Sequence, residues 1–191
     1  MEIFREPVFD RKERVLSVRL LQEFGAPSDY LTAEKVKELW EQASQFDVLF
    51  SDWTKGRIEP FLSALLSKNA VWFEFYDTIE VKPVGVAYVT QVHNGFDAVG
   101  HFTFWDKTAK GREPIVRNLM RRVFNTYDLH RMTAKIPVYQ KGVLAFARRL
   151  GFEEEGRVRE AVIYKENWND LILLGIVRDE LFEEKEDLNN E

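Results

Sequence analysis

The dipeptide Asn94-Gly95 stands between two runs of β-branched and aromatic residues, and it constrains the fold more than any other feature of this chain. Asn-Gly readily adopts the positive φ angles that tight hairpin turns require, so it is a strong short-range signal for a β-hairpin. It predicts that residues 84–92 and 98–105 pair as antiparallel strands. A third run of the same kind, residues 70–76, precedes them and predicts another strand.

Strand patterns and helical patterns alternate along the rest of the chain. Thr32 is a candidate N-cap for a first helix in which apolar residues recur at helical spacing, and Gly151 is a candidate C-terminal stop for the last one. The predicted helices cover residues 33–43, 58–66, 115–124 and 143–150. The predicted strands cover residues 15–24, 70–76, 84–92, 98–105, 131–136, 153–165 and 170–177, with a turn at residues 166–169. Helix-linked strands imply parallel pairing and hairpins imply antiparallel pairing. The order therefore predicts an α/β fold with a mixed sheet of about seven strands and helices on both faces.

The length and composition predict one domain spanning residues 1–191. Of the 191 residues, 45% are hydrophobic, which is enough for one core and argues against disorder. The chain has no cysteine, so disulfides, thiolate metal sites and a cysteine nucleophile are excluded. The three histidines do not have metal-ligand spacing, so no metal is expected.

The net charge of −5 comes from an acidic tail, residues 178–191, which carries seven acidic and two basic residues. Without the tail, acidic and basic residues are equal in number, and a neutral body argues against nucleic acid as a partner. The first residues lack a basic segment followed by an apolar one, so no signal peptide is expected. No apolar run approaches about 18 residues, so we expect no membrane partner and a cytoplasmic location.

A loop and helix start after the hairpin gather basic residues. Backbone N–H groups of residues 107–113, together with the helix dipole, would suit a pyrophosphate. Six basic residues crowd this region against one acid, Glu113; they are Lys107, Lys110, Arg112, Arg117, Arg121 and Arg122. The alternative interpretation is an ordinary solvated helix face.

Residues 137–152 read Pro-Val-Tyr-Gln-Lys-Gly-Val-Leu-Ala-Phe-Ala-Arg-Arg-Leu-Gly-Phe, and Glu155-Gly156-Arg-Val-Arg159 follows. A helix ending in Leu-Gly-Phe and then Glu-Gly-x-x-Arg resembles the C-terminal half of GNAT acetyltransferases. It is closest to the branch of ribosomal-protein N-terminal acetyltransferases, and Asn169-Asp170 also fits that branch. The resemblance covers about residues 84–177. Other short segments, such as residues 101–106, resemble GNAT-like proteins of bacteriophages more loosely.

The resemblance implies a sheet that splays open between strands 98–105 and 131–136, with acetyl-CoA as co-substrate in the opening. The pantetheine would lie near Phe104, Trp105 and Asp106. The pyrophosphate would lie on the loop made of Thr108, Ala109, Lys110, Gly111, Arg112 and Glu113, in which Gly111 alone matches the family pattern. Glu113 is unfavourable there unless its side chain turns away. Gln140 stands where the family has a cofactor-binding asparagine, and it retains the amide.

The resemblance also implies direct attack by an amine without an acyl-enzyme, which agrees with the absence of cysteine. The proton donors of related enzymes fall at Val143 and Ala147 here, so they do not carry over. His101 is the best-placed residue that titrates near neutrality, and Tyr139 is a candidate proton donor to the departing thiolate. A hydrogen-bonded structural histidine and a packing tyrosine are the alternatives.

The sequence therefore predicts an N-acetyltransferase that moves an acetyl group from acetyl-CoA to a primary amine. The acceptor would be a small molecule or a protein N-terminus, entering over residues 50–53 and the last hairpin. A weak base favours α-amines or arylamines over lysines, because neutralising a lysine at neutral pH costs about 4–5 kcal/mol and an α-amine about 1 kcal/mol. The alternative is a non-catalytic GNAT-fold protein that binds a partner, possibly in a phage particle. A monomer and a homodimer are both allowed.

Overall fold

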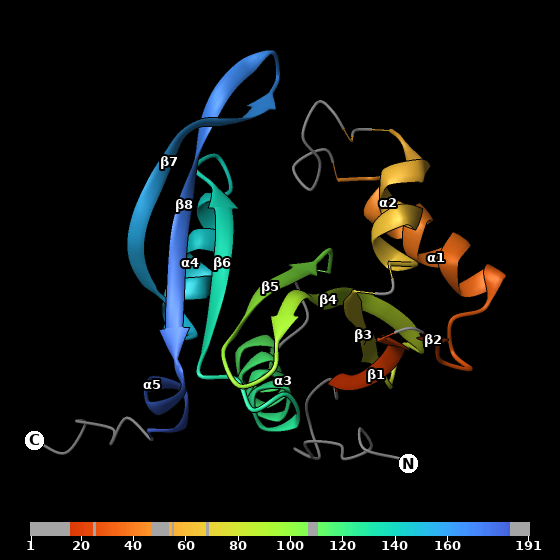
Figure 1. The fold of residues 1–191 in the computed structure, drawn as a ribbon. Helices are drawn as coiled ribbons and strands as arrows, with labels where there is room; N and C mark the ends of the chain where they lie inside the picture. The colour runs from red at the N-terminus through yellow and green to blue at the C-terminus, as the bar shows by residue number, and fades with distance from the viewer. Residues whose placement is uncertain are drawn as a thin grey trace, which may run out of the picture.

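The predicted strands and helices assemble into one mixed sheet with helices on its two faces (Figure 1). The computed structural model describes residues 16–24, 26–46, 54, 56–67, 69–106 and 111–183. The strands are β1 (Leu16–Glu23), β2 (Ala26–Pro27), β3 (Ala70–Asp77), β4 (Lys82–His93), β5 (Asp97–Phe104), β6 (Arg131–Pro137), β7 (Glu153–Tyr164) and β8 (Asn167–Val177). The helices are α1 (Ala33–Ala43), α2 (Ile58–Leu65), α3 (Arg112–Thr126), α4 (Lys141–Arg149) and α5 (Arg178–Phe182).

The strand order across the sheet is β2-β1-β3-β4-β5-β6-β8-β7. Every neighbouring pair is antiparallel except β5 and β6, which are parallel and are connected through α3. This is the mixed sheet of a GNAT-like fold, and the fold prediction is confirmed. The seven expected strands are present, and the two-residue strand β2 is an eighth that the sequence did not predict.

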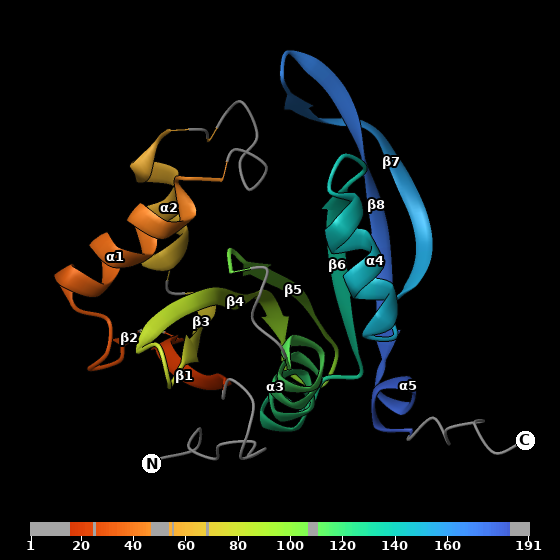
Figure 2. The same cartoon turned by 180° about the vertical axis from the view of Figure 1, so that it is seen from behind.

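Strands β5 and β6 pair over a short distance and then part. Three residue pairs join them, the last being Val99 with Thr133, although β5 continues to Phe104 and β6 to Pro137. Beyond that point neither strand serves as the other's partner, and β6, β8 and β7 stand away from β1–β5 (Figures 1 and 2). The predicted splay in the middle of the sheet is therefore confirmed.

Helices cover both faces of the sheet, and α5 adds Leu181 to the larger of the two cores. The larger core packs α3 and α4 on one face, where Val116, Phe124 and Leu144 meet strand residues such as Phe73 and Ile176. Figure 2 shows these two helices in front of the sheet. The smaller core packs α1 and α2 on the other face, and it consists of Leu21, Leu39, Leu65, Ala70, Trp72, Val86 and Trp105. Alternation of side chains along each strand thus assigns every strand residue to one of the two faces.

Local signals fixed several element ends as expected. Thr32 caps α1 by accepting a hydrogen bond from the backbone N–H of Lys35 at 3.2 Å. Gly95 adopts a φ of 82° in the β4–β5 turn, and Gly151 a φ of 101° after α4. Positive φ is the conformation that glycine adopts most readily, so both turns depend on it.

The turn between β7 and β8 lies earlier in the sequence than the predicted residues 166–169. The turn residues are Lys165 and Glu166, with φ of 51° and 62°, and residues 167–169 already belong to β8. Tyr164 pairs with Asn167, which makes a two-residue loop. Two-residue loops with positive φ match the twist of antiparallel strands, so the polar residues after Glu166 join the ladder.

The acidic tail begins as a docked helix. Leu181 of α5 is fully buried, and the guanidinium of Arg178 donates hydrogen bonds to the backbone oxygens of Phe124 and Leu129 at 3.2 and 2.9 Å. Residues 184–191 lie outside the described residues. Among those that the structure does describe, no helix is both long enough and apolar enough to cross a membrane.

Candidate active site

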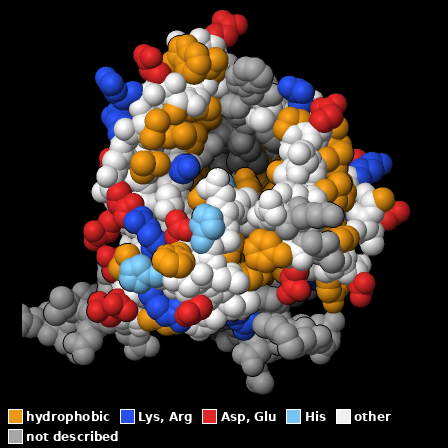
Figure 3. Space-filling view, viewed as in Figure 1, with side chains coloured by type: hydrophobic (Ala, Val, Ile, Leu, Met, Phe, Trp, Pro, Cys, Tyr) orange, Lys and Arg blue, Asp and Glu red, His pale blue; other side chains and the backbone are white. Residues whose placement is uncertain are grey.

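A cavity of about 190 Å³ opens where β5 and β6 part. Figure 3 shows this face of the molecule hollowed between the half that carries α1 and α2 and the half that carries the β7–β8 hairpin. The cavity is lined from β4, β5, β6 and the start of α4 by Tyr88, Gly100, His101, Phe102, Thr103, Ala134, Lys135, Ile136, Gln140 and Val143. The described lining contains no carboxylate. The walls are strand edges and side chains of both halves of the sheet, so the cavity passes through the splay.

His101 lies on the α1–α2 face of β5, because it alternates with Ala98 and Phe102, which pack in the larger core. Its imidazole stacks on the ring of Tyr88 with centroids 4.2 Å apart, and its Nε2 lies 3.2 Å from Oγ1 of Thr90. Burial, with a smaller contribution from the charge of Lys135, lowers the pKa of His101 to about 4. The imidazole is therefore neutral at neutral pH.

A ladder of stacked rings supports this histidine across three strands. Trp72 stacks on Tyr88 with centroids 4.0 Å apart, and Tyr88 stacks on His101 in turn. The indole Nε1 of Trp72 donates to the backbone oxygen of Ala64 in α2 at 3.0 Å. Burial raises the pKa of Tyr88 to about 12, so its phenol stays protonated. The sequence prediction missed Trp72 and Tyr88. Counting back from the hairpin turn places Tyr88 opposite His101 only when the bulge between Thr90 and His93 is included.

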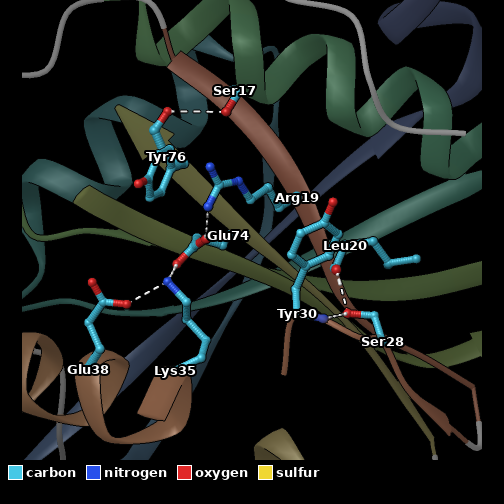
Figure 4. Close-up of polar contacts among 9 residues, drawn as sticks. All are labelled: Ser17, Arg19, Leu20, Ser28, Tyr30, Lys35, Glu38, Glu74 and Tyr76. Carbon is cyan, nitrogen blue, oxygen red and sulfur yellow. Dashed lines mark hydrogen bonds and ion pairs between the residues drawn. The ribbon is translucent and has the colours of Figure 1, made fainter. Parts of the chain in front are cut away.

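A buried carboxylate fixes α1 against the same face (Figure 4). Glu74 of β3 is fully buried; its Oε1 accepts a hydrogen bond from Nζ of Lys35 at 2.8 Å, and Arg19 lies 3.7 Å from Oε2. Nζ of Lys35 also donates to Glu38 at 2.5 Å, and the guanidinium of Arg19 lies 3.4 Å from the ring centroid of Tyr76. Burial raises the pKa of Glu74 although both cations oppose that change. The carboxylate is thus held by its partners and not by solvent.

The residues predicted near the pantetheine contact the sheet itself. The backbone N–H groups of Trp105 and Asp106 both donate to the oxygen of Val84, at 3.1 and 3.3 Å, and the indole N–H of Trp105 donates to Pro83 at 3.0 Å. The carboxylate of Asp106 lies 3.6 Å from Nζ of Lys82. The ring of Phe104 stacks on Phe75 with centroids 4.5 Å apart and does not line the cavity.

The start of α3 has a conformation suited to an anion-binding turn. Gly111 is the N-cap residue, with a φ of 74°, and Arg112 places its guanidinium 5.8 Å from the ring centroid of Phe104. The carboxylate of Glu113 does turn aside, since Nε of Arg149 donates to it at 3.3 Å. The other predicted loop residues, Thr108, Ala109 and Lys110, lie outside the described residues, as do Lys107 and the predicted acceptor entrance at residues 50–53.

Part of the basic cluster is used to join elements. The guanidinium of Arg117 donates to the backbone oxygens of Leu150 and Leu181 at 2.8 and 3.4 Å, and Nε of Arg121 donates to Leu181 at 3.2 Å. These carbonyls lie at the C-terminal ends of α4 and α5, where backbone oxygens lack helical partners. Arg117 and Arg121 therefore cap two helix ends, which the sequence prediction did not anticipate.

The structure brings His101 and Gln140 to the same cavity but not Tyr139. Gln140 is the N-cap of α4, and its backbone oxygen accepts hydrogen bonds from Val143 and Leu144. The ring of Tyr139 stacks on Tyr164 of β7 with centroids 4.0 Å apart, and it is absent from the cavity lining. Of the described His, Asp and Glu side chains, no three are grouped so that they could hold a metal ion.

Comparison with known proteins agrees with this geometry. A sequence profile described as an acetyltransferase (GNAT) domain matches residues 31–173. No curated protein matches the chain. Among solved structures, ribosomal-protein-S5-alanine acetyltransferase from Vibrio fischeri is similar, with a TM-score of 0.65 and 18% identity over 92% of this chain and 98% of its own.

Spermidine N-acetyltransferase from Vibrio cholerae is also similar to this chain. Its complex with CoA and spermine has a TM-score of 0.64 and 13% identity, covering 88% of this chain and 98% of that one. A dodecameric form of it in an intermediate state gives a TM-score of 0.67 and 14% identity, covering 90% and 98%. At these identities the likeness concerns the fold.

Proposed function

The chain belongs to the GNAT acetyltransferase family, and on that premise we propose that it moves an acetyl group from acetyl-CoA to a primary amine. The observation that carries this proposal is the parting of β5 and β6 after three residue pairs, with a cavity in the gap. GNAT acetyltransferases use acetyl-CoA, so the residues around this gap must suit a slender amide-containing chain as well as an amine.

The residues present fit that requirement. Beyond Val99 and Thr133 the facing edges of β5 and β6 do not pair with each other, so they offer backbone groups to the amides of a pantetheine. Gln140 belongs to the cavity lining, and Gly111 and the N-terminus of α3 lie at the end of the loop that follows β5. Glu113 is paired with Arg149 and does not oppose an anion there. When bound, acetyl-CoA supplies a thioester carbonyl that an amine can attack.

His101 is proposed to accept the proton that the attacking amine loses. It lies on the α1–α2 face of the cavity, which we propose as the acceptor side, and at neutral pH it is uncharged because its pKa is about 4. Such an imidazole is a weak base, so it suits acceptors that are already partly neutral. An α-amine with a pKa of about 8 has more neutral form at pH 7 than a lysine with a pKa of about 10.4.

Further features of the reaction and of the protein are proposed on the same premise. Tyr139 as proton donor would require its ring to leave Tyr164, so water is the simpler donor to the thiolate. Transfer without an acyl-enzyme is supported by the absence of cysteine. The protein is proposed to act as one domain in the cytoplasm, as a monomer or homodimer, without nucleic acid or membrane. No matched protein favours the non-catalytic alternative.

The test begins with binding and ends with turnover. At 100 times its Kd, acetyl-CoA should add about 2.7 kcal/mol to the free energy of unfolding. At about 2–4 °C per kcal/mol for a chain of this size, Tm should rise by several degrees. Pantetheine alone and the nucleotide portion of CoA alone serve as partial ligands. A rise in Tm with pantetheine tests binding between β5 and β6, and a rise with the nucleotide portion tests binding at the loop before α3.

Turnover is measured as thiol release with α-amines, lysine peptides, polyamines and arylamines. His101→Gln should lower kcat and leave acetyl-CoA binding intact, with Thr90→Val as the control that removes a neighbour of the ring. An unchanged Tm with millimolar acetyl-CoA would contradict the proposal.

A further inference from the structure

A single charged side chain, Lys135, belongs to the described lining of the cavity, and no part of the site assigned so far uses it. It lies in β6 between Ala134 and Ile136, which are buried in the larger core, so it points to the opposite face. His101 of β5 points to that same face. Lys135 and His101 therefore flank the acceptor side of the gap from its two walls.

Lys135 has no carboxylate partner among the residues that the structure describes. The neighbouring bases on this half of the sheet do have one: Arg131 contacts Glu155 at 2.5 Å, and Arg157 contacts Asp170. The Lys135 side chain is exposed, and its charge reaches into the site, since it contributes to the lowered pKa of His101. The described lining has no acid to offset this positive charge.

We propose that Lys135 selects acceptor amines that carry a carboxylate close to the amine, and that it disfavours polycationic acceptors. This inference rests on the proposed function of the same site. A carboxylate near the amine gains a charge-assisted hydrogen bond from the lysine ammonium, whereas a second ammonium is repelled by it. The chain would then differ in acceptor from the spermidine acetyltransferase that it resembles in fold.

The experiment compares acceptors that share one α-amine and differ in charge. The dipeptide amides Ala-Asp, Ala-Asn and Ala-Lys are used at equal ionic strength, with spermidine as a fourth acceptor. For the intact protein kcat/KM should fall in the order Ala-Asp, Ala-Asn, Ala-Lys, with spermidine poorest. One charge-assisted contact corresponds to about a tenfold preference for Ala-Asp over Ala-Asn.

Substitutions assign the preference to one side chain. Lys135→Gln should remove the preference for Ala-Asp, mainly through KM, and Lys135→Glu should reverse it in favour of Ala-Lys. Lys37→Gln is the matched control, because Lys37 lies on the solvent side of α1 with a 77% exposed side chain. A preference that survives in Lys135→Gln, or an intact protein that prefers Ala-Lys or spermidine, would overturn the inference.

Binding measurements separate this inference from the proposed function. Each peptide is added to the protein with and without CoA, and Tm is recorded. If acetyl-CoA does not bind but Ala-Asp amide raises Tm in a manner that requires Lys135, the proposed function fails, and with it the role of Lys135 in acceptor choice, while the binding of a carboxylate by Lys135 is shown. If acetyl-CoA binds and the three peptides behave alike, the inference fails and the proposed function stands.

Discussion

Glu74 and Lys135 lie on the same face of the sheet, one in each half, and they differ in burial and in partners. Glu74 is fully buried against Lys35 and Arg19, which tie it to α1 and β1. Lys135 is exposed beside the cavity and has no described acid as partner. The chain thus supplies counter-charges where a charged side chain is buried under a helix, and leaves without a described acid partner a charged side chain that lines the cavity.

The difference follows from the cost of burial. A buried charge without a partner is strongly destabilising, so a buried carboxylate in β3 requires cations from neighbouring elements. An exposed lysine is solvated and needs no partner for the fold to be stable. A charge that the fold does not require is available for recognition.

The largest effect is expected from Glu74→Leu, which removes the buried carboxylate that Lys35 and Arg19 share, although Lys35 keeps its contact with Glu38. Breaking a buried pair from one side costs about 3–5 kcal/mol, whereas replacing both partners by apolar residues is often neutral. The double variant Glu74→Leu/Lys35→Met should therefore regain most of the lost free energy of unfolding. Urea denaturation measures both.

The exposed Lys37–Glu41 pair provides the control for that series, since its side chains are 77% and 60% exposed. Glu41→Ala should change the free energy of unfolding by less than about 1 kcal/mol. Equal effects of Glu41→Ala and Glu74→Leu would show that the Glu74 cluster does not anchor α1.

An intermediate effect is expected from the pH dependence that His101 introduces. Its pKa is lowered from 6.5 to about 4 on folding, so between these values the unfolded chain binds a proton that the folded chain does not. The free energy of unfolding therefore falls as pH falls through this window. Between pH 7 and pH 5 the contribution is about 2 kcal/mol.

His101→Gln should make the loss of stability between pH 7 and pH 5 smaller by that amount, as followed by urea denaturation at each pH. His130→Gln is the comparison variant, because it removes a histidine outside the cavity lining. Identical pH slopes for the intact protein and His101→Gln would contradict the burial of a neutral imidazole.

The smallest effect is expected from Lys135→Gln on stability. The side chain is exposed and has no described ion pair, so the free energy of unfolding should change by no more than about 0.5 kcal/mol. This result, set beside a changed acceptor preference, would sharpen the contrast with Glu74. A loss of several kcal/mol would instead mean that Lys135 has a structural partner.

Much of the fold was predictable because its signals are local. Asn94-Gly95 set the central hairpin, Thr32 set the start of α1, and the apolar stripe of α3 set its buried face. The end of the last hairpin was not predictable from residue type, because Asn167 and Asn169 are typical of turns. Their place in β8 depends on pairing with β7, which is a property of two strands together.

The site was less predictable because it depends on register and on long-range contacts. His101 could be assigned to a face by alternation, and the same reasoning applied to β6 would have found Lys135. The stacking of Tyr88 on His101 depends on a bulge that adds one residue to β4. The pairing of Glu113 with Arg149, 36 positions away, depends on how α3 and α4 pack.

The short pairing of β5 with β6 also has a mechanical consequence. Among the described residues, β5 and β6 pair over three residue pairs, and the N–H groups of His130 and Arg131 donate to the oxygen of Phe96 beside them, so backbone hydrogen bonds join the two halves at one end only and apolar packing, in which α3 takes part, joins the rest. Apolar packing has no preferred direction, and small sliding movements cost it little, whereas a hydrogen-bonded ladder moves in whole register steps. The separation of β5 and β6 beyond Val99 and Thr133 can therefore change by small movements of one half of the sheet against the other. A ligand that forms hydrogen bonds with both strand edges would restrict those movements.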